Sequence, residues 1–267
     1  MKKEKKEKRY KIIIAVLLGV VAVQAVMLLR GRPAKGPKEI AVAPPPVVVK
    51  GRIAIVLDDW GYNLRNLQTL SKIKYPLTLS VLPNLSYSRQ MAEKAHRLGF
   101  EIILHLPMEP MEKCRLEKDT ILTTMDARQI TAILDRDLAA VPYCRGVSNH
   151  MGSRATGDIR TMKIVFGELK KRRLFFLDSL VSSSSVCSAL AGQMDLPFAK
   201  RDIFLDNEED AQYISRQLQK LKSRARTQGK AIGIGHDRPV TLAVLKEELP
   251  KLEKEGYKIV FVSEMEK

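Results

Sequence analysis

The sequence predicts an α/β domain with a parallel sheet, either a barrel or a doubly wound sheet, behind one transmembrane helix. Three observations support this prediction. Short apolar runs without polar alternation, typical of strands buried on both faces, recur from residue 53 onward. Amphipathic stretches of helical length separate several of these runs, as expected where crossover helices join parallel strands. The apolar stretch 12–29 is long enough to cross a bilayer.

The N-terminal residues have the composition of a membrane anchor. Residues 1–11 hold seven Lys/Arg against two Glu, and Gln24 is the one strongly polar residue of the stretch 12–29. A buried core helix of this length normally keeps a polar face, so we expect a single-pass span. The basic segment 1–11 is expected in the cytoplasm, which makes the rest of the chain extracytoplasmic, on the periplasmic or cell-wall side.

Residues 30–50 contain five prolines and are expected to form a stiff linker to a domain at 51–267. The motif Ala41-Val42-Ala43 is similar to a cleavage site, but it lies more than ten residues beyond the apolar stretch. An uncleaved signal anchor is therefore the better interpretation.

The net charge of +16 is divided between the anchor and the domain. Residues 1–50 carry +9, which fits a topology signal and contact with anionic lipid, and the domain carries +7. A moderately basic domain favours acidic partners such as envelope polymers. Nucleic acid is not an expected partner, because no recognised motif is present and aromatic residues make up 6% of the chain.

The expected elements of the domain follow from the positions of these runs. Gly99 and Gly256 are typical helix ends. The predicted strands are 53–57, 77–82, 101–105, 146–150, 174–178, 202–205, 231–235 and 258–262, and the predicted helices are 86–98, 127–140, 160–172, 208–228 and 240–255.

Cys114, Cys144 and Cys187 contain no C-x-x-C pair, so a zinc ribbon is excluded. Two interpretations stay open. One disulfide with one free thiol would suit an oxidising compartment, and three small buried side chains would need no special chemistry.

Titratable residues follow several predicted strands, at the sheet edge where α/β proteins collect their chemistry. Asp58 and Asp59 follow the first strand, and three of the four histidines, His105, His150 and His236, follow later ones. We expect the adjacent carboxylates to point to opposite sides of their strand and so to have different roles. His96 lies inside a predicted helix and is expected to be exposed.

One Asp and two neutral His form a suitable ligand set for a divalent metal, with zinc the first expectation and one position left for water. Nickel or cobalt would accept the same ligands. The metal would acidify that water, a nearby carboxylate would take its proton, and a histidine would protonate the leaving group.

Other polar residues near these strand ends are candidates for substrate binding or for supporting the ligands. Glu109 follows His105 by four positions and is either a fourth ligand or a solvent-exposed residue. Asn149, Ser153 and Arg154 surround His150, and Asp178 ends another strand, where a helix cap or a structural ion pair is the alternative.

As a set, these motifs resemble the divergent polysaccharide deacetylases, a group similar to the NodB-type carbohydrate esterases. The resemblance covers about residues 52–265. It implies an irregular (β/α) barrel of about seven parallel strands and a metal-dependent N- or O-deacetylase mechanism. The motifs occur in the family's order: Ile55-Val56-Leu57-Asp58-Asp59-Trp60-Gly61, the strand ending at His105, Asn149-His150-Met151-Gly152-Ser153, Leu177-Asp178-Ser179 and Gly233-Ile234-Gly235-His236.

Carried over by position, the resemblance implies that Asp58 is the catalytic base and Asp59 a metal ligand. His105 corresponds to the first histidine of the family's His-x-x-x-His ligand pair. Glu109 stands at the second position, and we infer that His150 supplies the missing ligand.

His236 corresponds to the late histidine that acts as general acid. The family's Arg-x-Pro-Tyr and Asp-x-x-Asp-Trp motifs are not recognisable here. Asn149, Arg154 and Asp178 stand in their region.

Three functions remain open at this point. The leading hypothesis is a membrane-anchored enzyme that removes acetyl groups from peptidoglycan or another acetylated envelope polysaccharide. The second is a glycan-binding or scaffold protein that keeps the barrel and has lost catalysis, which the substituted ligand position favours. The third is hydrolysis of another bond such as a phosphoester, for which only Arg154, Arg201 and Arg238 are candidate cations.

Overall fold

The computed structural model describes residues 2–30 and 49–265, which form two separate units. The first unit is a single helix, α1 (Lys2–Arg30), which extends the predicted span through most of the basic segment 1–11. By length and composition it is long and apolar enough to cross a membrane. Most of the predicted linker at 30–50 lies outside the described residues.

The second unit contains nine strands within the described residues, and every pairing between them is parallel. All eight predicted strands are present, and β6 was not predicted. The strands are β1 (Gly51–Trp60), β2 (Thr78–Val81), β3 (Glu101–Met108), β4 (Cys144–Met151), β5 (Phe175–Asp178), β6 (Phe198–Lys200), β7 (Ile203–Phe204), β8 (Lys230–His236) and β9 (Tyr257–Val260).

The strands close into an irregular barrel. The strand order is β6-β5-β4-β3-β2-β1-β8-β7, so the two outermost strands are consecutive in the chain and separated by Arg201 and Asp202. The Arg201 backbone N–H donates to the Asp178 carbonyl, and that of Asp202 donates to the Ile232 carbonyl. Taken as one interrupted strand, β6 and β7 complete a ring of seven, which confirms the predicted barrel, and β9 pairs with the start of β1.

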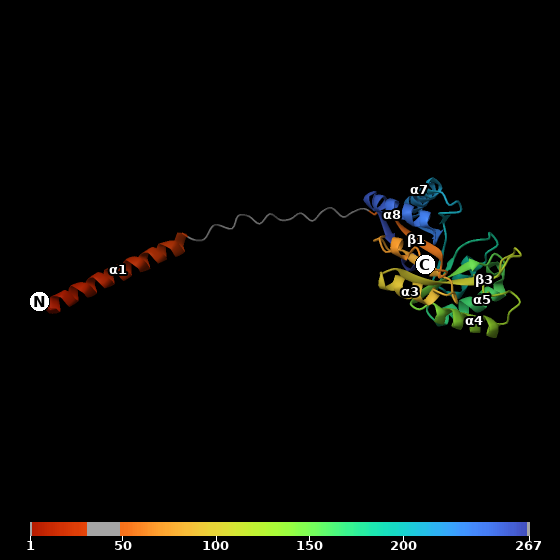
Figure 1. Ribbon diagram of the computed structural model, residues 1–267, viewed down its shortest axis with the longest axis horizontal. Helices are drawn as coiled ribbons and strands as arrows, with labels where there is room; N and C mark the ends of the chain where they lie inside the picture. The colour runs from red at the N-terminus through yellow and green to blue at the C-terminus, as the bar shows by residue number, and fades with distance from the viewer. Residues whose placement is uncertain (1, 31–48, 266–267) are drawn as a thin grey trace. The chain divides into compact units, whose positions relative to one another are not determined.

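Helices cover the outside of the strands, with α7 beside α8 and α4 beside α5 (Figure 1). The five predicted helices are confirmed with ends that differ by three residues or fewer, and α2 and α6 were not predicted. The helices are α2 (Leu67–Leu70), α3 (Ser88–Arg97), α4 (Ala127–Ala140), α5 (Ile159–Lys171), α6 (Cys187–Met194), α7 (Ala211–Gln228) and α8 (Pro239–Lys254), with short 3-10 turns η1 (Ala155–Gly157) and η2 (Val262–Glu264).

Local sequence explains where the longer helices begin and end. Asp126 and Gln129 form a reciprocal capping box at the start of α4, and the Asp210 carboxylate accepts from the backbone of the first turn of α7. Gly229 ends α7 at φ 77°, a left-handed conformation that suits glycine.

Two apolar clusters hold the barrel together. The larger lies between the strands and the helices, and the smaller fills the barrel interior. Val262 and Met265, which follow β9, belong to the interior cluster together with Val56 of β1. They pack beneath the barrel at the end where strands begin, and the other end is left to polar side chains.

The three cysteines form no disulfide and are not all buried, so neither of the two interpretations left open by the sequence describes them. Cys114 is exposed, Cys144 is half-buried and Cys187 is buried, and all three thiols are free. No disulfide joins them, and burial does not explain all three.

Candidate metal centre

A β-bulge at the end of β1 brings two carboxylates to one place. The pairing of β1 with β2 is regular up to Leu57 and then shifts before Trp60. Asp59, inside this irregularity, has φ 66°. A bulge redirects side chains, so the expectation that Asp58 and Asp59 point to opposite sides is wrong. Asp58 Oδ2 lies 3.7 Å and Asp59 Oδ1 3.3 Å from the same atom, His105 Nε2.

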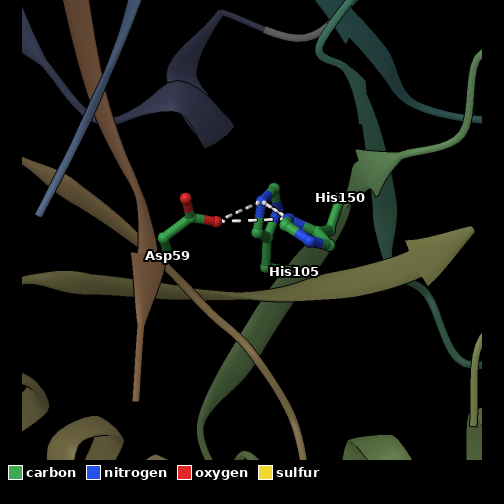
Figure 2. A group of neighbouring side chains, drawn as sticks. All are labelled: Asp59, His105 and His150. Atoms are coloured by element: carbon green, nitrogen blue, oxygen red, sulfur yellow. Dashed lines mark hydrogen bonds and ion pairs between the residues drawn. The ribbon is translucent and has the colours of Figure 1, made fainter. Parts of the chain in front are cut away.

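Asp59, His105 and His150 form a compact group in the carboxyl-terminal halves of β1, β3 and β4, with β3 continuing past His105 to Met108, and Figure 2 shows the carboxylate facing both imidazoles. Asp59 Oδ1 lies 3.3 Å from His105 Nε2 and 3.2 Å from His150 Nδ1, and the two nitrogens are 3.2 Å apart. Tetrahedral ligands at metal distances of 2.0–2.1 Å lie about 3.3–3.4 Å from one another. The three atoms therefore match one face of a tetrahedral site.

The burial of this group also fits a cation. His105 is 3% exposed, and Asp59 Oδ1 is buried without a hydrogen bond of normal geometry. A buried carboxylate oxygen without such a partner is costly, and an ion would remove that cost. Within the described residues, no other cluster of His, Cys, Asp and Glu has this spacing. We name Asp59, His105 and His150 the metal trio.

Two serines that the sequence did not reveal orient the His105 ring. Ser148 Oγ lies 2.8 Å from His105 Nδ1 and 2.6 Å from Ser80 Oγ, and both serines are buried. Occupying Nδ1 in this way directs Nε2 to Asp59, which is how outer residues commonly fix a ligand ring. Ser148 lies two residues before His150 on β4, so both side chains belong to the same face of that strand.

The two adjacent aspartates have opposite pKa shifts. Burial raises the pKa of Asp58 above its ordinary value, and the charge of Asp59 adds to this effect. Burial acts in the same direction on Asp59, but the imidazoles of His105 and His150 hold its pKa well below the ordinary range. The surroundings thus favour the ionised form of Asp59 and increase the proton affinity of Asp58.

His236, at the end of β8, pairs in register with Asp58 of the neighbouring strand. Its Nδ1 lies 2.8 Å from Asp206 Oδ1. Asp206 Oδ2 accepts from the His236 backbone N–H and from Thr241 Oγ1. Burial by itself would lower the pKa of His236, but the hydrogen bond and charge of Asp206 raise it.

Asp206 is a functional candidate that the sequence analysis missed. It is fully buried and follows the apolar run Ile203-Phe204-Leu205, which was a predicted strand. The rule that selected Asp58 and His105, a polar residue directly after an apolar strand, would have selected Asp206 as well.

A stack of planar groups supports His236 from the side. The Phe204 ring lies 6.2 Å from the imidazole at 17°, and the Arg201 guanidinium lies 3.6 Å above the Phe204 ring. Arg201 also donates to the carbonyls of Ser179 and Leu180. The loop after β5 is thereby tied to the position of His236.

Glu109 is neither a ligand nor free in solvent. Its Oε2 accepts from the backbone and hydroxyl of Thr123, at 2.6 and 2.7 Å, and its Oε1 lies 3.4 Å from Arg154 Nε. Its backbone carbonyl accepts from the amides of Arg154 and Ala155. We expected Glu109 to be either a fourth metal ligand or a solvent-exposed residue. These contacts show instead that it fastens the loop after β3.

The remaining predicted substrate residues lie around the metal trio with partners of their own. Asn149 is buried, accepts from the Ser179 amide and donates to the Met151 carbonyl. Ser153 Oγ accepts from the Met111 amide.

Asp178 and Arg154 differ in exposure. Asp178 is buried and accepts from Leu180 and Ser185, and burial raises its pKa. Arg154 leaves half of its side chain exposed. The two other candidate cations for a phosphoester also have protein partners, the carbonyls described above for Arg201 and Glu209 for Arg238. His96 is exposed, as expected, and stacks on Tyr143.

Comparison with known proteins gives a consistent result. A model of the divergent polysaccharide deacetylases matches residues 55–265. YibQ, an uncharacterised protein of Escherichia coli K12, is 36% identical over 200 residues, which cover 75% of this chain and 63% of YibQ. An uncharacterised protein of Haemophilus influenzae is 32% identical over 203 residues, 76% of this chain and 72% of that protein.

Among solved structures, the uncharacterised protein ATU2773 of Agrobacterium tumefaciens C58 superposes with a TM-score of 0.78 at 27% identity. The match covers 83% of this chain and 92% of ATU2773. The barrel is thus shared with a crystal structure over nearly its whole length.

Proposed function

The chain belongs to the divergent polysaccharide deacetylase family, and we propose that it is a membrane-anchored, metal-dependent hydrolase. In this proposal the domain is extracytoplasmic and removes acetyl groups from an envelope glycan such as peptidoglycan. One observation carries it: the metal trio lies beside a carboxylate and an imidazole whose pKa values are both raised.

Asp59, His105 and His150 are assigned as ligands of a divalent cation, with zinc preferred for a tetrahedral N/O site. Such a cation would acidify a water molecule and polarise the acetyl carbonyl. The carboxylate of Asp59 and the ring nitrogens supply the charge and geometry, and Ser148 keeps His105 in the required orientation.

Asp58 and His236 are assigned as the proton-transfer pair. Asp58 Oδ1 is buried without a hydrogen-bond partner and is free to accept a proton from the attacking water. His236 is held by Asp206, which favours its protonated form, so it can give a proton to the leaving sugar oxygen or nitrogen. Arg154, the most exposed of the predicted substrate residues, is assigned to contact with the glycan.

The test measures acetate release from chitin oligomers and acetylated peptidoglycan fragments by the full-length chain supplied with zinc. We expect release by the unaltered protein and a loss of about 10²–10⁴-fold in Asp58→Asn, which keeps the shape of the side chain but cannot act as a base. Asp135→Asn, which alters an exposed carboxylate on α4, is the matched control and is expected to leave release unchanged. Equal release by Asp58→Asn would refute the assignment.

A second candidate is a glycan-binding or scaffold protein without turnover. The observation that favours it is Glu109, which occupies the position of a family ligand and instead fastens a loop. This candidate predicts that Asp58→Asn preserves the cellular function of the protein and its binding to glycan fragments, with no acetate release by either form.

A further inference from the structure

Cations gather at the end of the barrel where strands begin. The second residue of β1, β4 and β9 is a cation, Arg52, Arg145 and Lys258, and all three are exposed. The exposed Arg224 and Arg226 lie in the last turns of α7, just before β8. Two carboxylates at this end are already paired, Glu255 with Lys222 and Asp202 with Arg224. We name this surface the cationic end.

Two neighbouring hollows open at the cationic end and share Arg145 and Ser263. The larger, about 450 Å³, is also lined by Arg172 and Arg173. Arg172 is neutralised by Glu168 and Asp135. Arg145 and Arg173 have no side-chain hydrogen bond or ion pair with any residue that the structure describes. Two unpaired guanidinium groups beside one hollow are suited to a phosphate group.

Exposed apolar side chains lie at the smaller hollow or next to its lining residues in the chain. Tyr143 lines the smaller hollow, stacks on His96 at 4.1 Å and is 53% exposed. Leu98, which directly follows α3, is 46% exposed. An amphipathic aromatic ring and an aliphatic side chain among cations are typical of surfaces that bind at the headgroup level of a bilayer.

The chain enters the domain at the cationic end. β1 begins at Gly51, and a Cβ atom at Gly51 would lie 2.5 Å from the Ala225 carbonyl, so the entering chain packs closely against the end of α7. Arg224 and Arg226 flank Ala225. The segment that leads from the apolar helix therefore joins the domain beside its cations and not beside the metal trio.

We propose that the cationic end binds the anionic phospholipid surface of the membrane that holds α1, with lipid phosphates at Arg145 and Arg173. Because parallel strands separate their two ends, this contact turns the metal trio away from the bilayer and towards the glycan. The proposal rests on the membrane attachment in the proposed function and is independent of catalysis.

The test places the full-length chain in lipid nanodiscs, either of phosphatidylcholine alone or with phosphatidylglycerol, and follows amide hydrogen exchange. We expect the segments that contain Arg145, Arg173 and Arg226 to exchange more slowly in the discs with phosphatidylglycerol than in the neutral discs. Added salt should remove this protection. Inorganic phosphate added to neutral discs should not reproduce the protection, which separates a membrane contact from binding of free phosphate.

Two variant pairs with the same change of charge sharpen this test. Arg145→Gln with Arg173→Asn removes the unpaired guanidinium groups, and Asn suits the φ of 56° at position 173. Since each cation near an anionic surface strengthens binding about fivefold, this pair should weaken docking about 25-fold. Arg115→Gln with Lys118→Gln, on the loop after β3 at the other end, is expected to keep the protection.

The outcomes separate the two proposals. A chain that does not stay with the discs refutes the membrane attachment, and with it the docking. A chain that stays with the discs but exchanges equally in neutral and anionic lipid refutes the docking alone, as does equal loss of protection in both variant pairs. Exchange of the β1 and β3 core amides, compared in each variant, shows that the fold is retained.

Discussion

The two ends of the barrel are made by the same strands and differ in the burial of their titratable side chains. Towards the end where the strands finish, Asp58, His105 and Asp206 are buried. His105 is hydrogen-bonded to Ser148, and Asp206 is hydrogen-bonded to His236. Where the strands begin, Arg52 and Arg145 are exposed. Since all strands run in one direction, the position of a residue along its strand decides which end it joins. Burial shifts the proton affinities of the titratable groups where the strands finish. Exposure lets the cations where the strands begin attract anionic partners over a longer range.

The largest expected effect concerns the metal trio, at the end of the barrel where the strands finish. Asp59→Ala removes the ligand atom that both imidazoles of the metal trio face, and zinc affinity should fall by more than about 100-fold, because even outer residues contribute 10–100-fold. Metal analysis of the purified protein after dialysis measures this. Asp135→Ala is the control and should retain one zinc per chain. Zinc retained in Asp59→Ala would contradict the assigned site.

The next effect concerns the proton on His236. His236→Ala should lower acetate release by about 10²–10⁴-fold. Asp206→Asn should keep part of the activity but change its pH dependence. A general acid must be protonated, so release falls as pH rises through the pKa of His236. Removing the Asp206 charge lowers that pKa, and the alkaline fall in kcat/KM should move to lower pH.

If kcat/KM of Asp206→Asn falls at the same alkaline pH as that of the unaltered protein, His236 is not the general acid. Thr241→Val provides a milder comparison, because it deletes one hydrogen bond to Asp206 and leaves its charge in place. Because the carboxylate charge that raises the pKa of His236 is retained, the alkaline fall in this variant should stay much closer to that of the unaltered protein than in Asp206→Asn.

A smaller effect tests the loop that borders the end where the strands finish. Glu109→Ala leaves the Thr123 amide without its partner and should lower the free energy of unfolding by about 1–3 kcal/mol. Metal content should be unchanged, because Glu109 binds the loop and not the metal trio. Thermal unfolding and metal analysis of the same preparation separate the two roles, and loss of zinc would assign Glu109 as a ligand.

The smallest effect concerns the cationic end. Arg226→Gln with Lys258→Gln changes two exposed cations, so the free energy of unfolding should stay within about 0.5 kcal/mol and acetate release from soluble oligomers should not change. Denaturant unfolding and the acetate assay check this. A loss of activity on soluble oligomers would show that the two ends are coupled.

The fold was predictable from sequence wherever a run of residues is uniformly buried. The strand around Ile53 and the helix beginning at Ala127 carry their periods and caps locally. The three-residue β6 and the helix α6 carry too few residues for a period, and their positions depend on tertiary pairing.

The candidate site was predictable to the extent that the same ends of parallel strands meet. Asp59, His105 and His150 could be grouped because each lies at or just after the end of a predicted strand, whereas the bulge that turns Asp58 and Asp59 to one side has no local signal in this sequence. Glu109 was ambiguous for a different reason. Its partner Thr123 belongs to the same long loop, and only the folded path of that loop brings the two together.

The pairing of β1 with β9 has a consequence for biogenesis. Gly51, at the start of the domain, is the register partner of Tyr257, and Val262 and Met265 complete the interior. During synthesis β1 is made first and cannot pair with β9 until nearly the whole domain has been made, so its apolar side chains stay incompletely packed. For the extracytoplasmic location proposed above, this incomplete state suits passage through a translocation channel, and its unpacked apolar side chains leave it open to proteases until the last strand pairs.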